Sequence, residues 1–290
     1  MLRRGPIGLV LLANVWLGAL TVPAANGQDE PQPTEAVVSP QNFRKQAVIG
    51  NRWAPMQPGT RWIYEGTSQE DDGKVVPHRI IVTATDLTKM IGGVRTLISY
   101  DLDYKDGELV EAELAFYAED DDGNVWQFGE YPEEYEDGKF IQSPAWIHGQ
   151  KGARAGIMMP ANPRIGDSSF AQGWGPSVNW KDRGLVYQIG QTIHVPAGTF
   201  EDTLVIKESA QGEKDAEQLK YYASGVGNIR TGWLGKNATV TENLELMKVE
   251  RLSSAELRSV RLKALRLESD AYRRSKDVYG KTVRSVARNP

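Results

Sequence analysis

Residues 98–117 read ISYDLDYKDGELVEAELAFY and predict a β-hairpin. Apolar and polar residues alternate through both halves, which is typical of strands with one buried face. The apolar face consists of Ile98, Tyr100, Leu102 and Tyr104 in the first half and of Val110, Ala112, Leu114 and Phe116 in the second. A Lys-Asp-Gly turn at residues 105–107 separates the halves. The stretch therefore indicates an antiparallel sheet with one apolar face.

The length of this hairpin loop follows from the matching of the two faces. Directly paired residues of an antiparallel ladder lie on the same face, so pairing apolar with apolar requires an odd number of loop residues. A three-residue loop with Gly107 in the left-handed conformation meets this requirement. We expect Leu102 to pair with Val110 and Tyr100 with Ala112.

The turn at residues 121–123 (Asp-Asp-Gly) extends the pattern to a third strand. A loop there would pair Ala118 with Trp126 and Phe116 with Phe128 on the same apolar face. Three consecutive strands are thus predicted to form a meander with one buried side.

The second half of the chain has similar stretches of β-forming residues, separated by bends at residues 196–198 and 225–227. We predict strands at residues 185–189, 192–195, 203–207, 219–223, 227–233 and 240–247. About ten to twelve short strands predict an all-β fold, an antiparallel barrel or sandwich. Residues 143–176 are rich in Gly, Pro and Asn, fit no period, and are expected to form a long irregular loop.

The C-terminal segment is predicted to be an amphipathic helix. Ser253 and Glu256 fit a capping box, and apolar residues then recur at spacings of three and four to about Tyr279. The apolar stripe of residues 253–279 needs a surface to cover it. Docking on the protein's own β-domain, self-association through a coiled-coil seam, and contact with a membrane surface or an anionic polymer all remain open.

Charge is distributed unevenly along the chain. Residues 28–250 carry 21 Lys/Arg against 34 Asp/Glu, whereas residues 251–290 carry 11 against 4. The predicted hairpin register places Asp101 opposite Glu111, with Glu113 beside them, and such like charges destabilise a sheet unless they are solvated or neutralised. We interpret these acids as a solvated polar face and expect the basic helix to lie near it.

The N-terminus has the three parts of a cleavable secretory signal. Arg3 and Arg4 are followed by an apolar run at residues 7–20 and by small residues at 25–27, which favours cleavage before Gln28. The apolar run is shorter than the roughly 20 residues that span a membrane. Because the chain has no cysteine, a lipid anchor at a lipobox is not expected. We predict a protein that is exported, periplasmic or extracellular, and soluble after cleavage.

These observations divide the chain into four parts. The predicted parts are a signal peptide at 1–27, a proline-rich linker at 28–50, a β-domain at 51–250 and a basic C-terminal helix at 251–290.

The sequence contains no convincing catalytic or cofactor motif. It lacks G-x-S-x-G, and His78, His148 and His194 stand far apart without the spacing of metal ligands. The absence of cysteine excludes thiolate metal sites. We therefore predict no catalytic residue, no metal and no cofactor. An exported acidic body also argues against nucleic acid as a partner.

Trp146, Trp174 and Trp180 lie in or beside the irregular segment. Exposed rings there would stack on a sugar or cover a lipid-binding mouth, and we take these three residues as candidate ligand-binding residues. Packing in the core is the alternative interpretation of the same residues.

Several motifs together resemble a family of exported bacterial β-rich proteins, many of them lipoproteins. The motifs are MQPGTRWIYEG at 56–66, FYA at 116–118, DGNVW at 122–126, MPANP at 159–163, VPAGTF at 195–200 and YYASGVG at 221–227. The family usually has proline where Ser224 stands, and its lipoproteins carry a cysteine that this chain lacks. The resemblance implies a bacterial source and a β-rich fold. The family has no assigned activity, so it implies no site residues.

From the sequence we expect a non-enzymatic envelope protein that binds a ligand or an envelope partner. One alternative is a secreted hydrolase acting on a carbohydrate polymer, for which Asp101 and Asp103 share a strand face. The other is a structural protein that associates through its C-terminal helix. A cavity lined by aromatic rings would favour binding, and two facing carboxylates would favour hydrolysis.

Overall fold

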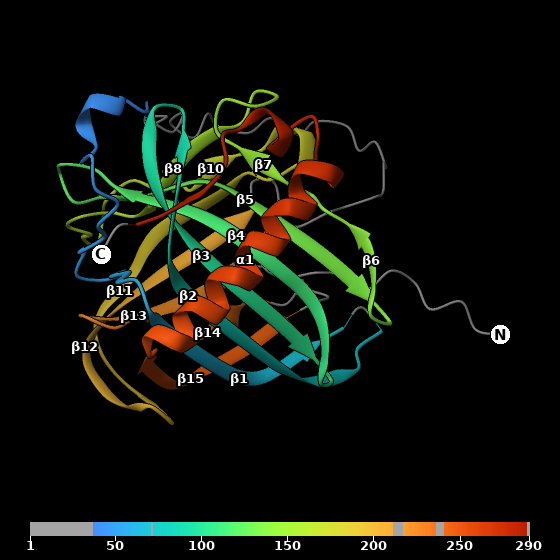
Figure 1. The fold of residues 1–290 in the computed structure, drawn as a ribbon. Helices are drawn as coiled ribbons and strands as arrows, with labels where there is room; N and C mark the ends of the chain where they lie inside the picture. Colours follow the sequence, from blue (N-terminus) through green and yellow to red (C-terminus); the bar gives the residue numbers. More distant parts are fainter. Residues whose placement is uncertain (1–36, 71, 211–216, 236–240, 289–290) are drawn as a thin grey trace, which may run out of the picture.

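The computed structural model describes residues 37–70, 72–210, 217–235 and 241–288. The predicted signal peptide and the first part of the predicted linker lie outside the described residues. The fold is all-β with one C-terminal helix, as the sequence predicts (Figure 1).

The strands are longer than predicted, and the described residues contain sixteen of them. Strands β1 to β5 are Thr60–Gln69, Val75–Ile91, Val94–Lys105, Glu108–Glu119 and Val125–Glu136. Strands β6 to β10 are Lys139–Gln142, Trp146–Ile147, Arg154–Met159, Phe170–Ala171 and Gly173–Trp174. Strands β11 to β16 are Asp182–Val195, Gly198–Ala210, Glu217–Ala223, Gly227–Leu234, Thr241–Arg251 and Val286–Ala287. The helices are α1 (Ser254–Arg274) and the 3-10 turns Pro40–Asn42, Pro176–Val178 and Tyr279–Lys281.

All strands belong to one antiparallel sheet. Thirteen of them follow the order β10-β8-β5-β4-β3-β2-β1-β15-β14-β13-β12-β11-β9, while β6 and β7 pair with β5 and β16 pairs with β2. The sheet curls until β8 lies near β9, and a Cβ atom on Gly156 would lie 2.4 Å from the carbonyl oxygen of Ala171. Among the described residues no ladder joins these ends, so the sheet is a sandwich-like curl and not a closed barrel.

The two faces of the sheet bury different side chains. The inner face holds one apolar cluster, which includes Trp62, Tyr64 and Leu244. The outer face of β2 to β5 holds a second cluster, in which Ile98 and Phe116 pack with residues of α1. Because residues alternate between faces along each strand, both sides of these strands become buried.

The first hairpin has the predicted matching of faces but a different loop. Its loop consists of two residues, Asp106 and Gly107, with φ of 50° and 83°. Such a turn matches the twist of the strands and is favoured for Asp-Gly. Val110 is the extra residue of a bulge, so Leu102 pairs with Ala112 and not with Val110. The predicted three-residue loop was wrong. The extra residue that makes apolar residues pair with apolar residues lies in the bulge of the ladder and not in the loop.

The second hairpin confirms one predicted pair and corrects the other. Ala118 pairs with Trp126, as expected. Phe116 pairs with Gly129 and not with Phe128, because a second bulge lies between Phe116 and Tyr117. The predicted three-strand meander is confirmed.

Helix α1 begins with the predicted capping box. The Ser253 hydroxyl accepts a hydrogen bond from the Glu256 backbone N–H at 3.3 Å, and Glu256 Oε2 accepts one from the Ser253 N–H at 2.8 Å. The helix crosses the outer face of the sheet over β2 and β4 (Figure 1). Its buried side chains are Val260, Ala264, Leu267, Glu268 and Ala271. Docking on the protein's own β-domain is thus confirmed.

A buried ion pair anchors the C-terminal segment. The Lys89 ammonium donates to Glu268 Oε1 at 3.0 Å and to the carbonyl of Val283 at 2.6 Å, and it lies 4.1 Å from the ring centre of Tyr279. Glu268 Oε1 also accepts from Ser285. Burial lowers the pKa of Lys89, and the charge of Glu268 opposes this effect.

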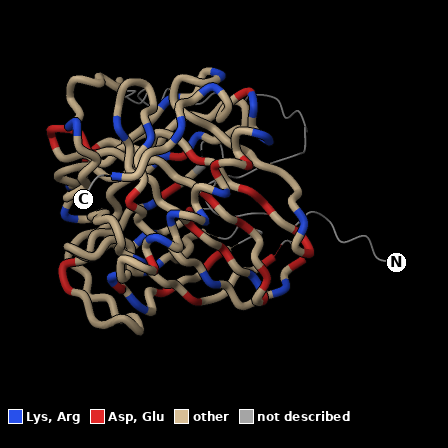
Figure 2. Tube along the Cα trace, viewed as in Figure 1, with Lys and Arg blue, Asp and Glu red and all other residues tan. Residues whose placement is uncertain are grey.

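The expectation that the basic helix neutralises Asp101 and Glu113 was wrong. The helix covers the apolar face of β3 and β4, whereas these acids lie on the opposite, inner face. Basic residues of the helix instead pair with acids of the outer face of the sheet, such as Arg274 with the buried Glu133 at 2.6 Å and Arg261 with Asp86. Figure 2 shows both signs of charge interspersed over the fold.

Candidate functional site

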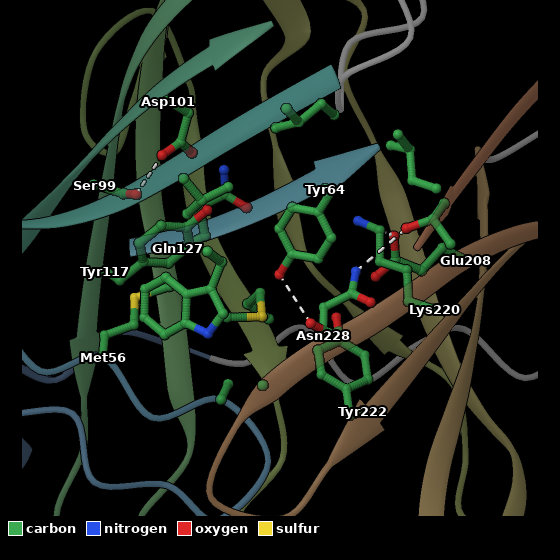
Figure 3. Close-up of a pocket in the computed structure, with 18 of the residues that line it drawn as sticks. Met56, Tyr64, Ser99, Asp101, Tyr117, Gln127, Glu208, Lys220, Tyr222 and Asn228 are labelled. Carbon is green, nitrogen blue, oxygen red and sulfur yellow. Dashed lines mark hydrogen bonds and ion pairs between the residues drawn. The ribbon is translucent and has the colours of Figure 1, made fainter. Parts of the chain in front are cut away.

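The curled sheet surrounds a cavity of about 170 Å³ on its inner face (Figure 3). Its lining residues come from β1 to β5, β8 and β12 to β15, from residues 54–56 before β1, and from Gln172 between β9 and β10. The cavity therefore exists only once strands that are distant in the sequence have been brought together by the curl.

Aromatic rings form part of the cavity wall, and hydrogen bonds hold two of them in position. The lining rings are Trp62, Tyr64, Tyr117 and Tyr222, all buried. The indole N–H of Trp62 donates to the carbonyl of Val226 at 2.8 Å, and the Tyr64 hydroxyl donates to the carbonyl of Asn228 at 2.8 Å. Burial raises the pKa of Tyr64 and of Tyr222, so both hydroxyls stay protonated. Rigid rings of this kind present apolar faces to a ligand at little entropic cost.

The cavity lining also contains an ion pair, which Lys220 and Glu208 form. Lys220 Nζ lies 2.7 Å from Glu208 Oε2, and Gln172 Nε2 donates to Glu208 Oε1 at 2.6 Å. The three side chains come from β12, β13 and the segment between β9 and β10, and Figure 3 shows Lys220 and Glu208 together. Their mutual contacts fix the polar atoms that a ligand would meet.

Asp101 is a second acidic group of the lining. Its Oδ1 accepts a hydrogen bond from the Ser99 hydroxyl at 2.6 Å, as Figure 3 shows. Burial raises the pKa of Asp101 to about 7, against the opposing effect of this hydrogen bond. The carboxyl group is thus one that changes protonation near neutral pH.

Asp101 belongs to a ladder of acidic pairs on the inner face of β3, β4 and β5. Asp101 pairs with Glu113, Asp103 pairs with Glu111, and Glu111 pairs with Glu134. Burial, followed by the charges of neighbouring acids, raises the pKa of Glu111 and Glu113 well above the ordinary value. The sequence interpretation of these acids as a solvated face was wrong, because the curl of the sheet buries Asp103, Glu111 and Glu113 and leaves Asp101 only partly exposed.

His78, Asp103 and Glu242 form a compact group beside this ladder. His78 Nε2 lies 2.7 Å from Asp103 Oδ1, and one donor atom of each of the three residues lies within 4.8 Å of the others. Burial tends to lower the pKa of His78, but the hydrogen bond and charge of Asp103 outweigh it and the pKa is raised. Burial raises the pKa of Glu242, a cavity-lining residue, to about 7.

The tryptophans predicted to bind a ligand lie elsewhere. Trp146 and Trp180 are buried and stack on each other with ring centres 4.4 Å apart, whereas Trp174 is partly exposed. None of the three is among the described residues that line the cavity. Binding at these rings stays a prediction, but the faces of Trp146 and Trp180 that touch each other are already covered.

The sequence contained only part of the signal for the cavity. The sequence shows that acidic residues alternate with apolar ones in residues 101–113. It does not show that the acidic face becomes buried. Nothing in the sequence linked His78 to Glu242, which lies more than half the chain away. The other two histidines stay separate from this group: His148 Nδ1 accepts from the Ala155 N–H, and the exposed His194 contacts Thr199.

Within the described residues no helix is both long and apolar enough to cross a membrane.

No protein-family model matches the chain, and no curated protein matches it. Two solved structures are similar at 12% sequence identity, and each covers 69% of this chain. One is a Bacteroides fragilis protein described as exported and as having a YmcC-like fold, which is covered over 100% of its length with a TM-score of 0.40. The other is a Parabacteroides distasonis protein described as a lipoprotein, which is covered over 99% with a TM-score of 0.38.

Proposed function

We propose that this chain is an exported binding protein of the bacterial envelope that holds a small ligand in the cavity of the curled sheet. The observation that carries the proposal is a cavity in which fixed aromatic rings face carboxyl and amide groups. Ligand sites typically combine apolar walls with a few convergent polar groups in this way. The signal-like N-terminus supports export.

The volume of the cavity limits the size of the ligand. Cavities for drug-sized ligands measure roughly 300–1,000 Å³, whereas an engineered cavity of about 150 Å³ admits benzene. A cavity of about 170 Å³ therefore fits one six-membered ring with a few substituents.

The polar lining indicates which substituents the ring should carry. Among the ionisable groups of the lining, acids outnumber bases: it contains the carboxyl groups of Asp101, Glu208 and Glu242 but a single ammonium group, that of Lys220. A ligand with hydroxyl or amine donors would satisfy these acceptors, whereas a carboxylate ligand would meet like charge. We therefore expect a single-ring alcohol or amine.

The size also favours binding over the hydrolysis of a carbohydrate polymer. Glycoside hydrolysis uses a pair of carboxyl groups, and the lining contains three, but a polymer also requires a groove that accepts several sugar rings. A cavity for one ring does not provide this.

Thermal-shift and ligand-observed NMR measurements with benzylamine, methyl glucoside and benzoate test the proposal. We expect the amine, the glucoside or both to bind and benzoate not to bind. Val82→Phe, which adds volume to the cavity wall, should abolish that binding, and Val75→Phe, at an exposed position of the same strand, should not. Failure of all three probes to bind, or equal binding by both variants, would contradict the proposal.

A further inference from the structure

We infer that His78, Asp103 and Glu242 form a binding site for one divalent transition-metal ion, with Zn²⁺ as the preferred ion. The three side chains come from β2, β3 and β15, and one donor atom of each lies within 4.8 Å of the others. Bonds of about 2.0–2.2 Å to Zn²⁺ place two ligand atoms at most about 4.3 Å apart. A side-chain shift of less than about one ångström therefore closes the set around an ion.

Burial and missing partners distinguish this group from an ordinary acidic cluster. The exposed fractions of His78, Asp103 and Glu242 are 2%, 1% and 2%. Each residue has a buried atom without a hydrogen-bond partner among the described residues, namely His78 Nδ1, Asp103 Oδ2 and Glu242 Oε1. Buried polar atoms are rarely left unpaired, and an ion is one of the partners that explain such exceptions.

The charges around the group favour a cation. Asp103 also faces Glu111 across the ladder, so several carboxyl groups converge in one buried region. The nearby ammonium groups are already engaged, since Lys105 pairs with Glu70 at 3.2 Å and Lys220 pairs with Glu208 at 2.7 Å. A +2 ion bound by two carboxylates and a neutral imidazole balances the charge locally, which a buried ionic site needs.

One of the three ligands connects the group to the cavity. Glu242 also lines the cavity, so a fourth coordination position faces the space proposed for the ligand. Three protein ligands with one open position are typical of Zn²⁺ sites that bind a further molecule.

The donor set favours zinc over magnesium or calcium. One imidazole nitrogen with two carboxylate oxygens suits a transition ion, whereas Mg²⁺ and Ca²⁺ prefer oxygen ligands alone. The competing explanation is a proton shared by His78 and Asp103 at 2.7 Å. A proton shared by His78 and Asp103 would leave Glu242 Oε1 without a partner, whereas a bound ion would contact it. A substitution of Glu242 therefore distinguishes the two explanations.

Zinc titration of the chelator-treated full-length protein tests the inference and needs no organic ligand, so its outcome is independent of the proposed function. We expect one Zn²⁺ per chain by calorimetry, a higher melting temperature with zinc, and a visible absorption band when Co²⁺ replaces it. Glu242→Gln keeps the size of the side chain and should weaken zinc binding by about 100-fold or more, because even outer-shell substitutions cost 10- to 100-fold. The chelated variant should melt no lower than the chelated wild type, since it loses a buried unpaired carboxyl group.

Glu245→Gln is the matched control, because Glu245 lies on the same strand but is surface-exposed and pairs with Arg230. It should bind zinc like the wild type. His78→Gln should weaken binding and remove the Co²⁺ band even if the variant is less stable. Absence of zinc binding would overturn the inference and leave the shared proton as the explanation. Equal binding by Glu242→Gln and Glu245→Gln would overturn it as well, by showing an adventitious surface site only.

Discussion

Replacing Glu130 by glutamine should stabilise the protein at alkaline pH far more than at acidic pH. Glu130 is buried on the inner face, where Gln127 Nε2 donates to its Oε2 at 2.9 Å. Burial raises the pKa of this carboxyl group from 4.5 to about 8. Between these two pH values the unfolded chain has released the proton and the folded chain still holds it, so the free energy of unfolding falls as the pH rises.

The magnitude follows from the two pKa values. One pKa unit corresponds to about 1.4 kcal/mol, so a rise from 4.5 to about 8 costs at most roughly 5 kcal/mol above pH 8. Acidic neighbours such as Glu113 interact with Glu130 and share part of this cost. Glutamine removes the titration and keeps an oxygen that accepts from Gln127. We therefore expect Glu130→Gln to gain roughly 3–5 kcal/mol relative to the wild type between about pH 5 and about pH 9.

Urea unfolding of the chelated proteins at about pH 5 and about pH 9 measures this difference directly. Glu201→Gln, at an exposed position of β12, is the control and should show the same stability difference from the wild type at both pH values. If Glu130→Gln also differs from the wild type by the same amount at both pH values, the carboxyl group is not held protonated by burial and the reasoning fails.

Other perturbations test the packing of the fold, each by urea unfolding. Gly66→Ala should destabilise by about 3 kcal/mol or more, because its Cβ would lie 1.8 Å from the carbonyl oxygen of Asn243. Gly50→Ala is the control and should hardly change the free energy of unfolding, because its Cβ would meet no atom within 4 Å. If both variants lose the same stability, β1 and β15 have moved apart to accept the Cβ of residue 66 and the reasoning fails. Glu268→Ala should cost roughly 3–5 kcal/mol, because it leaves the Lys89 ammonium buried without its counter-ion; a loss below about 1 kcal/mol would mean that the pair does not anchor the C-terminal segment. Ser253→Ala should cost about 1 kcal/mol by removing the capping box of α1, and Ser253→Asp should restore most of it unless the cap is irrelevant.

Periodicity predicted the strands and the matching of their faces, but not the irregularities. Pairing apolar with apolar residues gave the correct parity for the first hairpin. A loop of three residues and a two-residue loop with a bulge satisfy the same parity, so the pattern alone could not choose between them. The Ala118–Trp126 pair was predictable because no bulge intervenes between it and the turn.

The candidate site was much less accessible to prediction. Trp146 and Trp180 were predicted to bind a ligand because they lie in or beside an irregular segment, yet they stack on each other. The rings that line the cavity, such as Tyr64 and Tyr222, lie in ordinary strands where sequence patterns give them no special status. Their convergence depends on pairings between strands that are far apart in the chain.

The sequence by itself determined the all-β class, the alternation of residues on β3 and β4, and the start of α1 at its capping box. These features depend on interactions between near neighbours, which leave a periodic or local signal. Only the tertiary structure decided that the acidic face of Asp101 and Glu113 is an interior and that His78, Asp103 and Glu242 meet there. Alternation shows that a strand has two faces, but which faces become buried depends on how the whole sheet curls and where the helix docks.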